Sequence, residues 1–320
     1  MIQLIPQEKN QRVLVLAGDK PFAEFWYPDS LEKPVLFSIY APNQQLVTRG
    51  FPLAPIKGES MDHPHHTGLW FNYEIVNGLD FWNNSYAIPA EKKKNYGWIK
   101  FDKFIQMEVG AEGSLSYLAY WRDQMGNSLL QENTTYQFSA DKETRYIDRT
   151  TDLTALVPVS FPDAKDGLLG LRLAKELELP SAQPKQYADN KGNTTNVLAN
   201  ESAGGNYLTS EGKQGDSAWG TRGRWCMIYG KKAQDTVSVV IIDHPANPGY
   251  PTYWHARGYG LFAANPLGEK IFSKGKETLN FALKIGEKVT FRYRIVIASG
   301  LYRLNNEVIN QMSDAFAQKN

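Results

Sequence analysis

Histidine is the residue type whose placement in this sequence is most informative. The chain of 320 residues contains five histidines, and His63, His65 and His66 fall within four consecutive positions. The other two, His244 and His255, share a second segment, and each segment contains an Asp-His-Pro tripeptide. Histidine exchanges protons near neutral pH and is the commonest metal ligand. The spacing therefore predicts a functional site if the two segments meet in the fold.

The first histidine segment supports more than one kind of chemistry. His63 and His65 are two residues apart, so in an extended chain their side chains point the same way. Pro64 favours an extended residue before it. The pair can then bind a divalent metal such as Zn, Fe or Mn, with His66, His255 or a carboxylate as third ligand. The histidines can also work without metal, or serve only to hydrogen bond to backbone in a turn.

In the metal-free interpretation, His65 or His66 is the general acid/base and His255 is its counterpart across a cleft. Asp62 and Glu59 then fix the tautomers of the histidines or supply the base. The expected substrate-binding residues are basic, aromatic or amide side chains. They are Arg257, Arg172, Trp70, Trp82, Trp254 and Asn72.

The two arginines are selected because of their neighbours in the sequence. Arg257 follows His255 by two positions, so an extended segment places both on one face, as at a site for an anionic or polyhydroxyl ligand. Arg172 interrupts an apolar stretch, and such an arginine usually needs a carboxylate partner or a ligand. Tryptophan can stack on a sugar ring, although burial in the core is its commoner role. These residues fit an anionic or a polyhydroxyl ligand, and a small carbohydrate is the partner that we expect.

The composition argues against several classes of partner. Lys and Arg number 35 against 34 for Asp and Glu, a formal charge of +1, whereas a nucleic-acid-binding chain is expected to be strongly basic. No apolar run approaches the roughly 20 residues that span a bilayer. The N-terminus lacks signal-peptide features, so we expect a soluble protein, cytoplasmic as read, or periplasmic or exported if a leader was removed. The sequence contains no phosphate-binding glycine loop, dinucleotide fingerprint, nucleophile elbow or cysteine-based metal motif.

Alternation of apolar and polar residues predicts an all-β fold. Regular short strands separated by Gly, Asp, Asn and Pro favour one large antiparallel sandwich domain over residues 1–320. Helical spacing is confined to residues 305–316, which predicts one C-terminal helix packed on a sheet. The polar segment of residues 181–223 is expected to be a lid, a binding loop or a disordered insertion.

The histidine segments and their surroundings resemble a known family. The first half of the chain reads Gly58-Glu59, Asp62-His63-Pro64-His65-His66, Gly68-Leu69-Trp70-Phe71, Val76-Asn77-Gly78 and Asp80-Phe81-Trp82. The second half reads Asp243-His244-Pro245, Trp254-His255-Ala256-Arg257, Gly260-Leu261-Phe262 and Asn265-Pro266-Leu267-Gly268. These motifs resemble the bacterial DUF6807 family, often labelled the PmoA family or methane oxygenase PmoA, over roughly residues 10 to 300.

What the resemblance implies is an uncharacterised family with a β-supersandwich similar to galactose mutarotase-like proteins. Particulate methane monooxygenase is a membrane enzyme, so the label does not give the function of a chain without a membrane span. Our leading hypothesis is a carbohydrate-active epimerase, lyase or hydrolase that uses histidine acid/base chemistry. The alternatives are a metal-dependent enzyme with a histidine-rich site, and a non-catalytic glycan-binding module in which aromatic residues bind the sugar.

Overall fold

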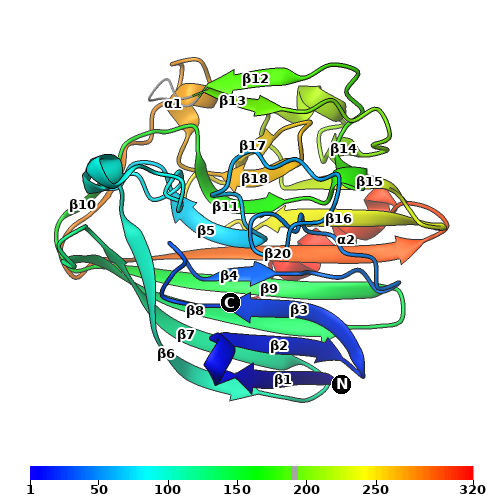
Figure 1. Ribbon diagram of the computed structural model, residues 1–320, viewed down its shortest axis with the longest axis horizontal. Helices are drawn as coiled ribbons and strands as arrows, with labels where there is room; N and C mark the ends of the chain where they lie inside the picture. The colour runs from blue at the N-terminus through cyan, green and yellow to red at the C-terminus, as the bar shows by residue number, and fades with distance from the viewer. Residues whose placement is uncertain (189–193, 320) are drawn as a thin grey trace.

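The computed structural model describes residues 1–188 and 194–319, and two large antiparallel sheets dominate it (Figure 1). The first sheet has eight strands, in the spatial order β1 (Ile2–Gln7), β2 (Arg12–Ala17), β3 (Lys20–Trp26), β4 (Val35–Phe37), β5 (Leu69–Tyr73), β11 (Gly167–Arg172), β18 (Leu261–Asn265) and β17 (Tyr253–Ala256). The second also has eight, in the order β14 (Asn206–Thr209), β15 (Trp225–Lys232), β16 (Asp235–Asp243), β20 (Lys288–Gly300), β9 (Thr144–Ala155), β8 (Ser128–Ala140), β7 (Gly113–Arg122) and β6 (Trp98–Glu108). The predicted all-β class is confirmed.

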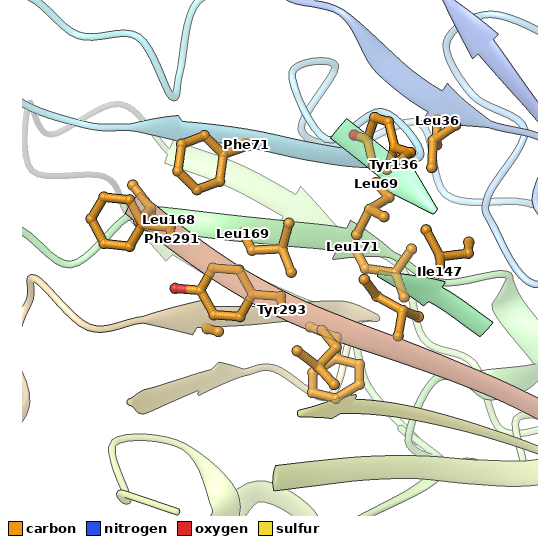
Figure 2. Packing of buried hydrophobic residues seen from close by; sticks show 14 of the residues in the cluster. Leu36, Leu69, Phe71, Tyr136, Ile147, Leu168, Leu169, Leu171, Phe291 and Tyr293 are labelled. Atoms are coloured by element: carbon orange, nitrogen blue, oxygen red, sulfur yellow. The ribbon is translucent and has the colours of Figure 1, made fainter. Parts of the chain in front are cut away.

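One large core lies between the two sheets (Figure 2). The first sheet contributes Leu69 and Leu171 to it, and the second contributes Ile147 and Tyr293, all of them fully buried. Successive side chains of a strand point to opposite faces, which is why the period-2 pattern identifies the residues that enter the core. Each fully buried leucine or isoleucine stabilises the fold by about 1.5–3 kcal/mol.

The smaller elements connect and cover the sheets. Strand β10 (Val159–Phe161) pairs with β19 (Phe281–Leu283), and β12 (Lys185–Ala188) pairs with β13 (Thr194–Val197). The helical elements are η1 (Glu8–Asn10), η2 (Ala90–Asn95), η3 (Lys175–Leu177), η4 (Gly215–Ala218), α1 (Glu269–Phe272) and α2 (Asn306–Phe316). The predicted C-terminal helix is present, and its N-cap is Asn305, whose side chain accepts a hydrogen bond from the Glu307 N–H at 2.8 Å. Within the described residues, no helix is long and apolar enough to cross a membrane.

The face of the first sheet that points away from the core positions the functional site. Trp70 pairs with Gly170, Gly170 with Ala263, and Ala263 with His255, so one row of residues crosses strands β5, β11, β18 and β17. The two central members of this row are small. A Cβ atom on Gly170 would lie 2.4 Å from the Trp70 ring and 2.8 Å from that of Trp82. Gly170 therefore provides the space in which both indole rings pack over the sheet.

The polar segment of residues 181–223 has more structure than a loop. It contains the β12–β13 hairpin, strand β14 of the second sheet and η4, while residues 189–193 lie outside the described residues. Figure 1 shows β12 and β13 at the edge of the molecule opposite β1 and β6. The hairpin contributes Tyr187 and Thr195 to the pocket described below.

Candidate active site

A small pocket lies over the outer face of the first sheet, where the two histidine segments meet. Its walls come from the turn at residues 63–66, from β17, β18 and the loop between them, and from the β12–β13 hairpin. The lining residues are His63, His65, His66, Trp82, Asn83, Lys165, Asp166, Tyr187, Thr195, His255, Arg257, Tyr259 and Leu261. Four of the five histidines thus surround one cavity.

The residues from His63 to His66 form a tight turn. The backbone N–H of His66 donates to the carbonyl of His63 at 2.9 Å, and His63 has a φ of 43°, a left-handed conformation that is uncommon outside glycine. The expectation of an extended segment with His63 and His65 facing the same way is therefore wrong. Their ring planes lie at 78° to each other, with the centroids 5.6 Å apart. Backbone strain of this kind is found most often at functional sites.

Aromatic rings hold the turn in place on the sheet. The ring of His63 lies parallel to the rings of Tyr259, at a centroid distance of 5.0 Å, and His66, at 4.7 Å. His66 in turn stacks on Trp70 at 5.2 Å and meets Trp82 edge-on at 5.9 Å. The outer face of the sheet therefore determines the orientation of both imidazole rings.

Asp62 is the electrostatic anchor of the turn. Its buried carboxylate accepts two hydrogen bonds from Arg172, at 2.8 and 3.0 Å, and others from Arg49, Ser60 and His63. Burial alone would raise the pKa of Asp62, but Arg172, His63 and Arg49 outweigh it and hold this pKa well below its usual range. Asp62 is therefore a permanent anion.

His63 is held by this anion in the geometry of a general base. Its Nδ1 lies 2.5 Å from Oδ1 of Asp62, so Nδ1 carries the proton and donates it to the carboxylate. The ring nitrogen left for a ligand is Nε2, for which the described residues offer no hydrogen-bond partner. Burial, partly offset by Asp62, lowers the pKa of His63 below 6.5, so the imidazole is neutral at pH 7. A neutral histidine backed by a carboxylate can accept a proton at Nε2.

The other two histidines of the turn are less suited to proton transfer. Nδ1 of His66 lies 3.4 Å from a guanidinium nitrogen of Arg172, which can only donate, so the proton of His66 is on Nε2. Burial is the main reason that the pKa values of His65 and His66 lie well below 6.5. Both remain neutral, and His66 offers a donor to the pocket.

The opposite wall carries His255 and a carboxyl group that the sequence did not single out. Nδ1 of His255 donates to the carbonyl of Lys165 at 3.1 Å and lies 3.3 Å from Oδ1 of Asp166. The second oxygen of Asp166 is 3.6 Å from the ammonium group of Lys165. Burial, reinforced by Asp80, raises the pKa of Asp166 although Lys165 opposes the shift.

Glu74 lies behind Asp166, away from the pocket lining. The backbone N–H of Glu74 donates to the carbonyl of Asp166 at 2.9 Å, and the Asp166 N–H donates to the Glu74 carboxylate at 3.2 Å. Burial and the neighbouring Asp166 raise the pKa of Glu74. Burial and neighbouring charges raise the pKa values of both carboxyl groups, so the pair holds a proton at a pH where isolated carboxyls have lost theirs.

Arg257 lies beside His255, as the sequence predicted. Its Nε donates to Nε2 of His255 at 3.3 Å, which leaves the His255 proton on Nδ1. The guanidinium lies over the rings of Trp219, at 4.6 Å from the centroid, and Tyr187, at 5.7 Å. These contacts fix the plane of the guanidinium at the wall of the pocket.

Two polar residues expected at the site lie behind it. The carboxylate of Glu59 accepts hydrogen bonds from the backbone N–H groups of Gly50, Phe51 and Ile56, so it holds a loop together and does not line the pocket. Arg172 has an exposed fraction of 0%, donates to Asp62 and does not line the pocket, and its expected role in substrate binding stays a prediction. Its apolar strand tolerates it because a carboxylate partner is present.

The remaining candidates divide between the pocket and the interior. Trp82 lines the pocket, whereas Trp70 is buried beneath His66 and reaches a ligand only through that ring. Trp254 is fully buried in the main core because it points to the opposite face from its neighbour in β17. The side chain of Asn72 is also buried and donates to the carbonyl of Phe81 at 2.6 Å. Trp70, Trp254 and Asn72 thus do not line the pocket, and their expected substrate-binding roles stay predictions.

The second Asp-His-Pro tripeptide does not join the pocket. Asp243 ends strand β16 of the second sheet, and Nε2 of His244 lies 3.0 Å from the carbonyl of Lys319, beyond the C-terminal helix. The ring of His244 packs edge-on against Phe316 of that helix, with centroids 5.1 Å apart. His244 is thus a structural histidine that hydrogen bonds to backbone, the alternative that the sequence left open.

Sequence reasoning missed Asp166, Lys165, Tyr187 and Tyr259. Tyr187 lies in the polar segment that was expected to be a lid or binding loop, and Tyr259 lies two residues after Arg257, so both had an indirect signal. Asp166 and Lys165 precede strand β11, and nothing in the sequence shows that this strand pairs with β5 and β18. Among the described residues, no group of three or more His, Cys, Asp or Glu side chains has an arrangement that could hold a metal ion. The His63 and His65 metal pair accordingly stays a prediction from sequence.

Comparisons with solved structures give only distant similarity. The GH36 alpha-galactosidase AgaB from Geobacillus stearothermophilus has a TM-score of 0.44 and 11% identity, with 95% of this chain and 42% of AgaB covered. The Slr1438 protein from Synechocystis sp. PCC 6803 has a TM-score of 0.39 and 8% identity, covering 94% and 96%. A galactose mutarotase related enzyme from Lactobacillus acidophilus has a TM-score of 0.32 and 12% identity, covering 95% and 100%. The chain spans less than half of the alpha-galactosidase, and scores this low carry no argument about activity.

The sequence itself gives a firmer assignment. No curated protein matches it. The model of one family, described as a family of unknown function, matches residues 12–314, which include both histidine segments and every residue that lines the pocket. The chain therefore belongs to the DUF6807 family.

Proposed function

We propose that the protein is an enzyme that acts by acid/base catalysis on a sugar or a sugar derivative. The observation that carries the proposal is that two groups capable of proton transfer, His63 and Asp166, face one small pocket. Nδ1 of His63 donates to the buried carboxylate of Asp62, and the backbone N–H of Asp166 donates to the carboxylate of Glu74. Catalytic sites commonly place groups with shifted pKa values in such a cleft.

In this proposal, His63 is the general base and Asp166 is the general acid. His63 is neutral and has a lone pair at Nε2, so it takes a proton from the substrate. Asp166, whose carboxyl group holds its proton to a higher pH than usual, supplies one from the other wall. Epimerisation, elimination and hydrolysis all need such a pair. His255 and Arg257 position the substrate on the side of Asp166.

The lining of the pocket favours a small sugar. Its lining combines hydrogen-bonding groups, such as Asn83 and Thr195, with the rings of Trp82, Tyr187 and Tyr259. Sugars present hydroxyl groups at the rim and C–H groups on the ring faces, so they need both kinds of contact.

The test is a search for turnover in D₂O. Neutral monosaccharides, uronic acids and aldonic acids are incubated singly with the purified protein, and ¹H NMR follows new signals and the loss of carbon-bound protons to solvent deuterium. For a substrate found in this way, H63Q and D166N are each expected to lower kcat by about 10²–10⁴-fold, the usual contribution of one acid or base. H244Q, at the histidine outside the pocket, is the matched control.

Three outcomes separate this proposal from its alternatives. Full turnover by both H63Q and D166N would remove the assigned acid and base. Sugar binding that persists in H63Q without turnover by the wild type would identify a glycan-binding module. Stoichiometric Zn, Fe or Mn in protein purified without a histidine tag, with activity lost on EDTA treatment, would favour the metal-dependent alternative.

A further inference from the structure

Arg257 has more donors than its neighbours use. Its Nε donates to His255, and the faces of its guanidinium are covered by the rings of Trp219 and Tyr187. Within residues 1–188 and 194–319, no carboxylate forms an ion pair with Arg257, and no hydrogen bond uses its two terminal nitrogens. The Arg257 side chain is half-buried and lines the pocket. Its terminal N–H groups are therefore available to a ligand.

The charge of the pocket wall is also unbalanced. The lining contains two cationic side chains, Arg257 and Lys165, and one acidic side chain, Asp166. The histidines of the pocket are neutral, and when Asp166 holds its proton, as proposed for the acid, neither Lys165 nor Arg257 has an ionised carboxylate in the lining. Arg257 acts on Asp166 electrostatically, but among the described residues no carboxylate lies within ion-pair distance of its guanidinium. A buried or half-buried cation in that position is stabilised by an anionic ligand.

The shape of the available group selects the kind of anion. A guanidinium held by its Nε side presents two parallel N–H groups, which match the two oxygens of a planar carboxylate. Only one arginine lines the pocket, and no α-helix of the described residues contributes to the lining, so the additional donors that phosphate sites usually have are missing.

We infer that the substrate is a sugar acid, such as a uronate, whose carboxylate is bound by Arg257. The inference rests on the proposed function for the sugar part of the ligand, and adds the group that distinguishes the substrate from neutral sugars. His255 orients Arg257 through the Nε contact, so it is a positioning residue for this carboxylate.

Matched ligands test the inference directly. Binding of D-glucuronate, D-glucuronamide, D-glucose and glucose 6-phosphate, and of the galacto counterparts, is measured by calorimetry on the full chain. A uronate is expected to bind at least about 10-fold more tightly than its amide and its neutral sugar, since a charged bidentate contact replaces a neutral one. R257Q is expected to weaken uronate binding by about 10- to 100-fold and to leave binding of the neutral sugar unchanged. R257K keeps the charge but loses the two parallel N–H groups, so its affinity for the uronate should lie between those of the wild type and R257Q.

Arg12 offers the control, because it is also a half-buried arginine stacked on a tryptophan, Trp26, but lies on β2 away from the pocket. R12Q should bind like the wild type. Equal affinity for uronate and neutral sugar, tighter binding of the sugar phosphate, or undiminished uronate binding by R257Q would each overturn the inference. Turnover of a neutral sugar through His63 would overturn it and leave the proposed function standing. Arg257-dependent uronate binding without any turnover would support the inference and overturn the proposed function.

Discussion

Replacing Asp62 with asparagine tests how far the pocket depends on one carboxylate. Asp62 lies between Arg49 and Arg172, whose side chains are 1% and 0% exposed, and it also orients His63. The substitution keeps the size of the side chain and removes its charge. We therefore expect it to affect the stability of the fold and the position of the proposed base together.

The size of the effect follows from the hydrogen bonds that the substitution removes. Arg172 donates to both carboxylate oxygens, at 2.8 and 3.0 Å, and an asparagine has one oxygen with which to replace them. Each charged hydrogen bond of this kind contributes about 1.5–3 kcal/mol. The other carboxylate near Arg172 is that of Glu178, at 3.8 Å. Leaving a buried cation without its partner costs about 3–5 kcal/mol, a large part of the roughly 5–15 kcal/mol that stabilises a typical domain.

Urea unfolding at pH 7 measures this difference. D62N is expected to lower the free energy of unfolding by about 3–5 kcal/mol, and the D62N/R172Q double variant should lose less than the sum of the single losses because the unpaired cation is gone. D314N is the matched control: Asp314 pairs with Arg224 at 2.6 Å, but the two side chains are 69% and 33% exposed, so its loss should stay below about 1 kcal/mol. A D62N loss as small as that of D314N would refute the anchoring role of Asp62.

Three further results are expected. G170A should destabilise the fold by about 1–3 kcal/mol, because its Cβ would lie 2.4 Å from the buried Trp70 ring. The control G204A should change stability little, because the nearest atom to its Cβ would be 3.8 Å away. Equal thermal unfolding temperatures of the two variants would contradict this prediction. Burial raises the pKa of Asp166 to about 6 and that of Glu74 to about 8 in the folded state, so the folded protein binds more protons than the unfolded chain above about pH 4. The contribution of these two protonated groups to the free energy of unfolding is fully present below about pH 4 and is lost as pH rises through the two folded-state pKa values. E74Q should make the free energy of unfolding fall less steeply with pH, and an unchanged slope would show that Glu74 does not hold the proton. For a substrate that is turned over, kcat should fall on acidification as His63 gains a proton below pH 6.5, and an acid limb that persists in a residually active H63Q enzyme would assign it to another group.

The fold could be predicted largely because burial alternates along the strands. The apolar positions 289, 291, 293, 295 and 297 form one face of β20, and the C-terminal helix begins one residue after the asparagine that caps it. The backbone of the first histidine segment could not be predicted in the same way. Pro64 favours an extended His63, but the bonds from Arg49 to the carbonyls of residues 60, 62, 63 and 66 curl the chain around one guanidinium. These tertiary hydrogen bonds override the local preference of the residue before a proline, and the spacing of residues in the sequence does not reveal them.

For the site, the sequence could identify residue types but not which face of a strand each would occupy. His255 and Trp254 are adjacent in β17, and the same alternation that places His255 in the pocket places Trp254 in the core. His244 shares the second segment with His255, yet it follows strand β16 of the second sheet directly and packs against Phe316 of the C-terminal helix. Proximity in sequence is therefore a poor guide here, since the decisive neighbours come from strand pairing.

The order of strands in the first sheet explains why the site needs all of these segments. Strands β5, β11, β18 and β17 are neighbours in space, although about a hundred residues separate β5 from β11 and again β11 from β18. The row from Trp70 through Gly170 and Ala263 to His255 joins these four strands, with the proposed base on the turn before β5 and the proposed acid just before β11. A side chain at Gly170 would collide with the rings of Trp70 and Trp82, and Trp82 lines the pocket. Gly170 is thus needed for the packing of a ring at the proposed site, and a search of related sequences for this site should include it.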